Sequence, residues 1–207
     1  AFADINNKVT TSHLELQIAG DLIVGEDGSN GLNALSEQPS GSNFTVKIYP
    51  TGGVRAMTGS FNGALVRVRG ASRVTIDGSI GGTGTDRSLT ITNTSVTTPS
   101  VVLFGSVGST PITNGTLKNC VVINGANTSS AVVISDANTL GNAGVFSNIT
   151  IQNNDIQKAF VGVFATGGAT PEERDRWTVT RSADRDSGPS SGIPVQTRRA
   201  LRCRATT

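Results

Sequence analysis

The chain has 207 residues and a formal net charge of +2, and it combines 25 glycines with few charged (15%) and few aromatic (4%) residues. This composition argues against helical bundles and ordinary α/β enzymes, and the near-neutral residues 1–170 offer no basic surface for nucleic acid. No apolar run approaches the ~18 residues of a membrane-spanning helix.

The N-terminal part predicts a short helix followed by strands. Phe2, Ile5 and Val9 are spaced by four residues or fewer, which indicates an amphipathic helix that could cap a larger structure. Residues 14–18 alternate between apolar and polar, as in a strand with one buried face, and residues 22–24 could continue that strand.

The next region is less regular. Residues 25–42 are predicted to be a polar loop because they are rich in Gly, Asn and Ser. A strand follows at residues 44–48 and stops at Pro50, and residues 51–63 are interpreted as a turn around Gly52-Gly53.

From residue 64 onward one sequence motif recurs, which we call the repeated phrase. It is a run of alternating aliphatic residues that ends in Asp, Asn or Gly. The copies are VTIDG at residues 74–78, LTITN at 89–93, LKN at 117–119 and IQN at 151–153. Asn tolerates the left-handed backbone of a sharp bend, and one such unit cannot bury its inner face alone, so copies must stack. Residues 148–168, with corners at Asn153-Asn154 and Gly167-Gly168, are the clearest coil of the predicted β-solenoid.

Three stretches resemble a known family. VTIDG at residues 74–78, GTDRSLTITNT at 84–94 and residues 148–163 are similar to the pectin-lyase-like parallel β-helix repeats of large secreted proteins from Bacteroidetes-type bacteria, which are type IX secretion cargo. The first two phrases are fairly specific to that group, whereas NITIQNN marks β-helices generally. The resemblance covers residues 1–170 and implies an all-β, right-handed parallel β-helix with a short N-terminal capping helix, and export from the cell. It implies no particular activity.

The two ends of the sequence suggest further features. The chain starts without Met and without a signal peptide, which we interpret as a piece of a longer parent chain. Residues 171–207 hold 8 of the 13 Arg and break the pattern, and three interpretations fit: a disordered linker, a basic interaction arm, or an out-of-frame translation. We therefore predict a parallel β-helix with its cap at residues 1–170 and an Arg-rich tail at 171–207.

Two acidic turns are candidate metal sites. Residues 81–86, GGTGTD, match the start of the calcium-binding nonapeptide GGxGxDxUx, but one copy supplies half a site and Ser88 stands where a large apolar residue belongs. Residues 26–30 lack the ligand spacing of an EF-hand loop. Both are interpreted as surface turns, and no metal or cofactor site is predicted.

The histidine and the cysteines give no catalytic signal. His13 is the only histidine, without a partner at zinc-ligand spacing and without a nucleophile elbow elsewhere. Cys120 and Cys203 are interpreted as a buried small residue and an incidental thiol, because a disulfide framework has no support.

Polysaccharide cleavage is the enzymatic hypothesis with the most merit. A lyase needs carboxylates or calcium and a basic residue, whereas a hydrolase needs two carboxylates. The available groups are Asp77, Asp86, Arg87, Lys118, Asp136 and Asp155. The sequence places no two of them together on one strand face, so no catalytic residue is predicted. Their convergence in one groove would favour an enzyme.

Asn-x-Ser/Thr triplets occur at Asn43, Asn93, Asn114, Asn127 and Asn148. If the bacterial resemblance holds, we expect Asn93 and Asn148 to serve turns and strand edges rather than to carry glycans.

Two function classes therefore stay open. The first is a non-catalytic module of a secreted or cell-surface protein. Such a module would act as a stalk, an adhesin or a carbohydrate-contacting surface, and its partner would be a polysaccharide or a host glycan. The alternative is a polysaccharide lyase or glycoside hydrolase of the pectin-lyase-like type. Neither requires a cofactor, nucleic acid or a membrane span.

Overall fold

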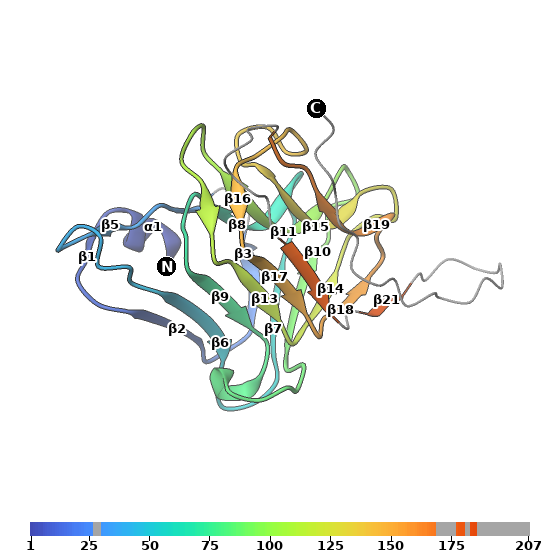
Figure 1. Ribbon diagram of the computed structural model, residues 1–207. Helices are drawn as coiled ribbons and strands as arrows, with labels where there is room; N and C mark the ends of the chain where they lie inside the picture. Colours follow the sequence, from blue (N-terminus) through green and yellow to red (C-terminus); the bar gives the residue numbers. More distant parts are fainter. Residues whose placement is uncertain (27–29, 169–176, 181–182, 186–207) are drawn as a thin grey trace.

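A computed structural model describes residues 1–26, 30–168, 177–180 and 183–185. The chain winds through three sheets of parallel strands, so that a complete coil adds one strand to each sheet (Figure 1). The predicted parallel β-solenoid is therefore confirmed.

The first sheet is assembled from strands of successive coils. In spatial order it contains β2 (Leu14–Ile18), β6 (Val46–Pro50), β9 (Val74–Asp77), β13 (Thr116–Lys118), β17 (Ile149–Gln152) and β20 (Trp177–Thr180).

The second sheet follows the first after a corner in each coil. In spatial order it contains β3 (Leu22–Glu26), β7 (Arg55–Gly59), β10 (Leu89–Asn93), β14 (Cys120–Ile123), β18 (Asp155–Gln157) and β21 (Ala183–Arg185).

The third sheet closes each coil. In spatial order it contains β4 (Leu32–Asn33), β8 (Ala64–Arg69), β11 (Ser100–Ser106), β15 (Ser130–Asp136) and β19 (Val161–Ala165).

The remaining elements lie outside these sheets. Two small parallel pairs join β1 (Val9–Thr10) to β5 (Ser36–Glu37) and β12 (Ile112–Thr113) to β16 (Phe146–Ser147). A 3-10 turn, η1 (Ile80–Gly82), follows β9. No helix among the described residues is long and apolar enough to cross a membrane.

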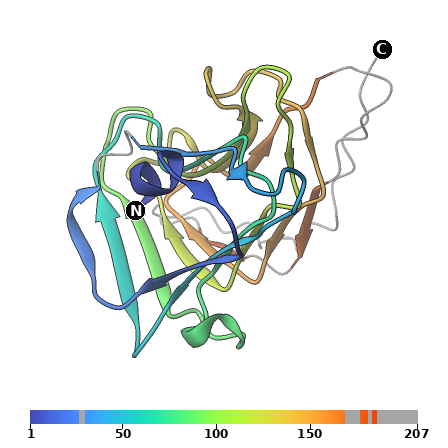
Figure 2. The ribbon, with the colours of Figure 1, turned by 90° about the vertical axis from the view of Figure 1, so that its left-hand side faces the viewer.

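The predicted capping helix is confirmed as α1 (Phe2–Asn6), which lies at the N-terminal end of the solenoid (Figure 2), but it is shorter than predicted, because Val9 lies in β1. The Asn6 side chain fastens it to the first coil: its Nδ2 donates to the Gly31 carbonyl at 2.8 Å, and its Oδ1 accepts from the Asn33 amide at 2.9 Å. The helix is thus held at the third sheet, beside β4.

Aliphatic side chains stack in rows inside the coils. One row of the first sheet consists of Ile48, Ile76, Leu117 and Ile151, all buried. Rows of this kind place similar side chains about 4.8 Å apart, so that they pack without polar groups between them. This stacking is the physical origin of the alternation seen in the sequence.

Asparagines form the corners on both sides of the first sheet. Asn119 and Asn153 follow β13 and β17, with φ angles of 57° and 50°, and Asn114 and Asn148 precede the same strands, with φ angles of 55° and 54°. Their amides bond to one another: Asn153 Nδ2 donates to Asn119 Oδ1 at 2.8 Å, and Asn148 Nδ2 donates to Asn114 Oδ1 at 2.6 Å. The left-handed role predicted for corner asparagines is confirmed, and Asn148 serves a turn.

The coils begin earlier than the repeated phrases indicated. The strand β2 belongs to the first sheet through its pairing with β6, and the stretch predicted as a loop at residues 25–42 contains β4 and β5. The turn predicted at residues 51–63 contains β7, whose residues are all half-buried. These strands were missed because β4 and β5 are two residues long and β7 lacks an apolar alternation.

Part of residues 171–207 is built into the sheets. The strand β20 pairs in parallel with β17, and β21 pairs in parallel with β18. The other residues of that range, Cys203 among them, lie outside the described residues, so the division into a β-helix and a tail stays a prediction.

Candidate functional site

The outward face of the first sheet carries an aligned row of polar side chains. Because successive strand residues point to opposite faces, the neighbours of the buried Ile48 row face away from the core. The strand registers align one outward row consisting of Glu15, Lys47, Thr75, Thr116, Thr150 and Thr178. The strand spacing places these groups about 4.8 Å apart, so the row presents evenly spaced hydrogen-bonding groups.

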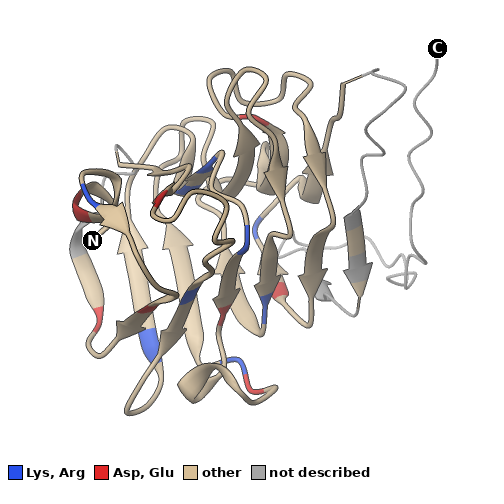
Figure 3. Ribbon diagram, turned by 60° about the vertical axis from the view of Figure 1, so that its left-hand side comes forward, with Lys and Arg blue, Asp and Glu red and all other residues tan. Residues whose placement is uncertain are grey.

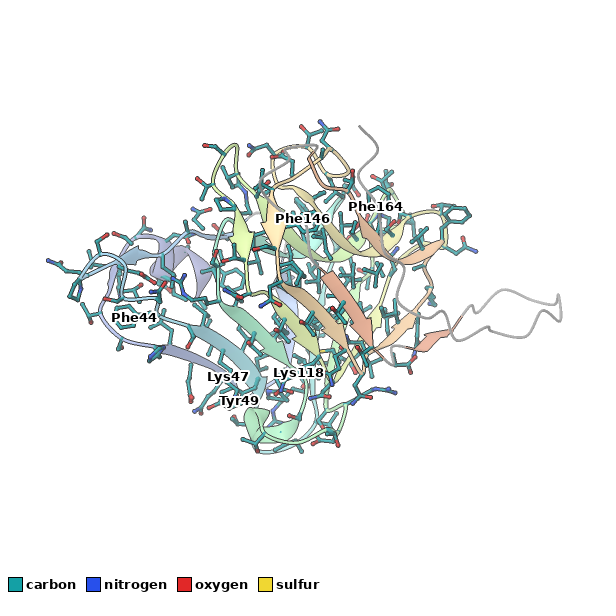
Figure 4. The ribbon with its side chains drawn as sticks, viewed as in Figure 1. Phe44, Lys47, Tyr49, Lys118, Phe146 and Phe164 are labelled. Atoms are coloured by element: carbon teal, nitrogen blue, oxygen red, sulfur yellow. The ribbon has the colours of Figure 1, made fainter. Side chains whose placement is uncertain are left out.

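A second outward row lies beside the first, at the end of the same strands. It contains Gln17 and Tyr49 on the first two strands and Asp77, Lys118, Gln152 and Thr180 on later strands. We call the two rows together the polar face. Lys47, Tyr49 and Lys118 lie near one another at its lower edge (Figure 4).

Tyr49 is held in the polar face by hydrogen bonds. Its hydroxyl donates to Glu15 Oε2 at 2.6 Å and accepts from Gln17 Nε2 at 3.0 Å, while Lys47 Nζ lies 5.1 Å from the ring centroid. The bond to the Glu15 carboxylate favours the protonated phenol, and partial burial adds to this effect, so the pKa of Tyr49 is raised. Tyr49 is only 6% exposed and therefore presents no open ring for stacking.

The buried carboxylate of Asp77 is the centre of the corner after β9. Asp77 Oδ1 accepts from Asn119 Nδ2 at 2.8 Å and from the Ser79 amide and hydroxyl at 3.0 and 2.8 Å. Its Oδ2 lies 3.0 Å from Lys118 Nζ. Burial alone would raise the pKa of Asp77, but the hydrogen bonds from Asn119 and Ser79 and the Lys118 ammonium outweigh it and lower the pKa.

The loop between β9 and β10 packs along the edge of the polar face. It approaches β6 at Gly82, where a Cβ atom would come within 2.6 Å of Lys47 Cε and 3.1 Å of Tyr49 Cγ. At its other end, Arg87 Nε and Nη2 donate to the Asn153 carbonyl and Oδ1 at 2.8 and 2.9 Å. The loop therefore spans several coils and fixes the edge of the face.

Asp86 stabilises that loop from within. Its Oδ2 accepts from the Ile80 amide at 3.0 Å and from the Ser88 hydroxyl at 2.6 Å. The bond from Ser88, followed by that from Ile80, lowers the pKa of Asp86. Within the part of the chain that the structure describes, no three His, Cys, Asp or Glu residues are grouped to hold a metal ion. The GGTGTD stretch thus forms a turn closed by its own carboxylate.

The residues considered for polysaccharide cleavage divide into two groups. Asp77, Asp86 and Lys118 lie around the corner described above, and Arg87 extends from the same loop to Asn153. Asp136 lies on the third sheet, where its Oδ1 accepts from the amides of the residues that follow it, and Asp155 opens β18 on the second sheet. Only the first group is brought together by the fold.

The remaining candidate residues have structural contacts. His13 Nδ1 lies 2.9 Å from Thr45 Oγ1 and accepts from the Thr45 amide at 3.1 Å, and its ring meets Phe44 edge-on at 5.6 Å. Cys120 is fully buried, and desolvation raises the pKa of its thiol far above the usual value. Of residues 26–30, positions 27–29 lie outside the described residues.

Asn93, one of the possible glycan acceptors, is fully buried at the corner between β10 and β11. Its Nδ2 donates to the carbonyls of Phe61, Gly63 and Ser100 at 2.7 to 2.9 Å. Asn93 therefore closes a turn, as expected.

Sequence reasoning missed the polar face because it depends on which strands are neighbours. Thr75, Thr116 and Thr150 each precede an aliphatic core residue in a recurring phrase. That shared position was the available signal, but only the strand registers show that the three threonines form one row.

Lys, Arg, Asp and Glu are few and are scattered along the ribbon among residues of other kinds (Figure 3). Comparison with known proteins found no matching family profile, no matching curated protein and no matching solved structure. The fold and its contacts thus define the class of protein, a parallel β-solenoid with an ordered polar face.

Proposed function

We propose that this chain is a non-catalytic module of a secreted or cell-surface protein, and that its polar face contacts polysaccharide. The observation that carries the proposal is the continuous outward row that includes Thr75, Thr116 and Thr150. A polysaccharide repeats hydroxyl groups along its length, and a row of fixed hydrogen-bonding groups on neighbouring strands can contact several sugars at once.

The chemistry of the face favours an uncharged glycan. Its central positions are threonines, and the charge of Lys118 is already matched by Asp77 at 3.0 Å. Because residues 1–170 are close to neutral overall, they provide no net field that would attract a polyuronate. We therefore expect neutral polysaccharides to bind better than acidic ones.

The location outside the cell rests on the resemblance of residues 74–78, 84–94 and 148–163 to repeats of secreted bacterial proteins. Fractionation of producing cells, with an antiserum raised against this chain, tests the location directly. Recovery in the cytosol alone would contradict it.

Affinity electrophoresis in gels that contain neutral polysaccharides or polygalacturonate tests the binding. The triple variant Thr75→Val, Thr116→Val, Thr150→Val keeps the shape and β propensity of the face but removes three hydroxyls, and we expect it to lose retardation. The control is Thr90→Val, on the outer face of the second sheet, which should migrate like the wild type. Absence of retardation by every polysaccharide, or equal retardation of the triple variant, would refute the proposal.

The alternative is a polysaccharide lyase or glycoside hydrolase. The observation in its favour is the meeting of Asp77, Asp86 and Lys118 at one corner. Asp77 is fully buried, its Oδ1 accepts hydrogen bonds and its Oδ2 is paired with Lys118, so the side chain would have to move to reach a sugar. Incubation with polyuronates, followed by the absorbance of an unsaturated product, tests the lyase version.

A further inference from the structure

One end of the polar face carries two opposite charges on neighbouring strands. Glu15 of β2 and Lys47 of β6 are directly opposite in the strand register, and Thr75 of β9 comes next in the same outward row. Glu15 is exposed and Lys47 is half-buried, and together they head the row of threonines. Because their charges sum to zero, this end of the face has no net field that favours an anion or a cation.

The Lys47 side chain is held in position by packing. Its Nζ lies 5.1 Å from the Tyr49 ring centroid, and its Cε passes close to Gly82, where a Cβ atom would come within 2.6 Å of it. Among the residues that the structure describes, none forms an ion pair or a hydrogen bond with Lys47 Nζ. The ammonium therefore retains its three N–H donors for a ligand or for solvent.

Glu15 supplies the matching acceptors. The Tyr49 hydroxyl donates to Glu15 Oε2 at 2.6 Å, and the same hydroxyl accepts from Gln17 Nε2 at 3.0 Å. These bonds orient an exposed carboxylate before any ligand arrives, which lowers the entropy cost of binding. A carboxylate has about four lone-pair sites, so Glu15 can accept further hydrogen bonds while it is bonded to Tyr49.

A donor and an acceptor side by side match two adjacent sugar hydroxyls, since each hydroxyl both donates and accepts. An anionic group would be attracted to Lys47 but repelled by Glu15, and a cationic group the reverse, so an uncharged group fits both. We infer that Glu15 and Lys47 form a subsite at the end of the polar face that binds two adjacent hydroxyls of one neutral sugar. This inference rests on the proposed contact of the polar face with polysaccharide, and it adds which glycans the face selects.

The subsite also aligns the bound chain. The outward row runs from Lys47 across Thr75 and Thr116 to Thr150, along the stack of coils. One strand spacing of about 4.8 Å is close to the length of a sugar in an extended 1,4-linked chain, so successive coils can contact successive sugars. Each sugar of a 1,4-linked chain keeps free hydroxyls on its second and third ring carbons, whereas the internal sugars of a 1,3-linked chain have no adjacent pair. The protein should therefore prefer 1,4-linked glycans.

Affinity electrophoresis with two neutral probes, 1,4-linked glucomannan and the 1,3-linked glucan laminarin, tests the subsite. Glucomannan should retard the wild type more strongly than laminarin does. Lys47→Met keeps the aliphatic stem beside Tyr49 but removes the donors, and the loss of a charge-assisted hydrogen bond should weaken glucomannan binding about tenfold or more. The matched control is Lys8→Met, which makes the same charge change at an exposed position and should bind like the wild type.

Folding of the variants is checked by circular dichroism. If Lys47→Met does not fold, Glu15→Gln decides, because it removes the charged acceptor at an exposed position while it keeps an oxygen for the Tyr49 hydroxyl. Glu15→Gln should also weaken glucomannan binding severalfold. Unchanged binding by a folded Lys47→Met or, in its place, Glu15→Gln protein would overturn the subsite.

The outcomes separate this inference from the proposed function. Equal retardation of the wild type by laminarin and glucomannan would overturn the subsite but leave polysaccharide contact by the threonine row intact. Stronger retardation by polygalacturonate than by glucomannan would show that Lys47 binds carboxylates, and would also overturn it. A wild type that no polysaccharide retards would refute the proposed function itself, and the subsite with it.

Discussion

Lys118 Nζ lies 3.0 Å from Asp77 Oδ2, and the two residues are directly opposite in the register of β13 and β9. The Asp77 side chain is fully buried, whereas that of Lys118 is 32% exposed. The pair therefore joins two successive coils at the corner where the polar face ends.

Replacing Lys118 with Met should destabilise the protein by about 2–3 kcal/mol, because it leaves a buried carboxylate without its counter-charge. The loss should be at the low end for a buried pair, since Lys118 is partly exposed. The free energy of unfolding from urea titrations is the measurement, and Lys8→Met is the control because Lys8 is exposed. Equal stability of the two variants would show that the pair contributes nothing.

The depressed pKa of Asp77 predicts how stability depends on pH. A carboxylate whose folded pKa lies below its unfolded value of 3.8 stabilises the fold above that value, and the contribution is lost as the pH falls through the folded pKa. As the pH is lowered from about 5 to about 2, the free energy of unfolding of the Asp77→Asn variant should therefore fall less than that of the wild type. Some acid sensitivity should remain, because the Ser88 hydroxyl also lowers the pKa of Asp86. Parallel stability curves for the two proteins would contradict this role of Asp77.

Asn119 combines a left-handed backbone with a hydrogen bond to Asp77. Asn119→Gly keeps the backbone conformation accessible but loses the bond to a charged group, for an expected cost of about 2 kcal/mol. Asn119→Ala should cost about 1 kcal/mol more because of the positive φ angle. Thermal and urea unfolding of both variants separate the two effects. An alanine variant as stable as the glycine variant would show that the backbone conformation carries no penalty.

Gly78 lies at a close approach of two adjacent coils. A Cβ atom at this position would stand 1.9 Å from the Asn119 carbonyl oxygen and 2.9 Å from Cys120 Cα. Gly78→Ala should therefore push the coils apart and cost about 3 kcal/mol or more. Gly20→Ala is the matched control, because nothing lies within 4 Å of its Cβ position, and it should change the free energy of unfolding by no more than about 0.5 kcal/mol. A Gly78→Ala protein as stable as this control would show that the contact is relieved elsewhere.

The strands with clean alternation could be predicted, and those without it could not. Residues 14–18 and 149–152 show alternating burial in the structure, as their patterns indicated. The strand β4 contributes only Leu32 to the core, and β7 contributes only Met57, so neither leaves a periodic signal. The corner asparagines were recognisable because left-handed positions favour Asn for a local, backbone reason.

The candidate sites likewise combine features that the local sequence predicts with features that depend on contacts between coils. That Asp77 stands at a corner follows from the phrase VTIDG, but its ion pair with Lys118 joins residues 41 positions apart and depends on the register of two coils. The alignment of Thr75, Thr116 and Thr150 likewise comes from neighbours in space.

The sequence by itself determined that short aliphatic strands alternate with Asn and Gly corners, because side-chain periodicity and backbone preference act within a few residues of one another. Only the tertiary structure decided which strands are adjacent, since loops of unequal length separate the repeated phrases. That adjacency creates the polar face and the Asp77–Lys118 corner.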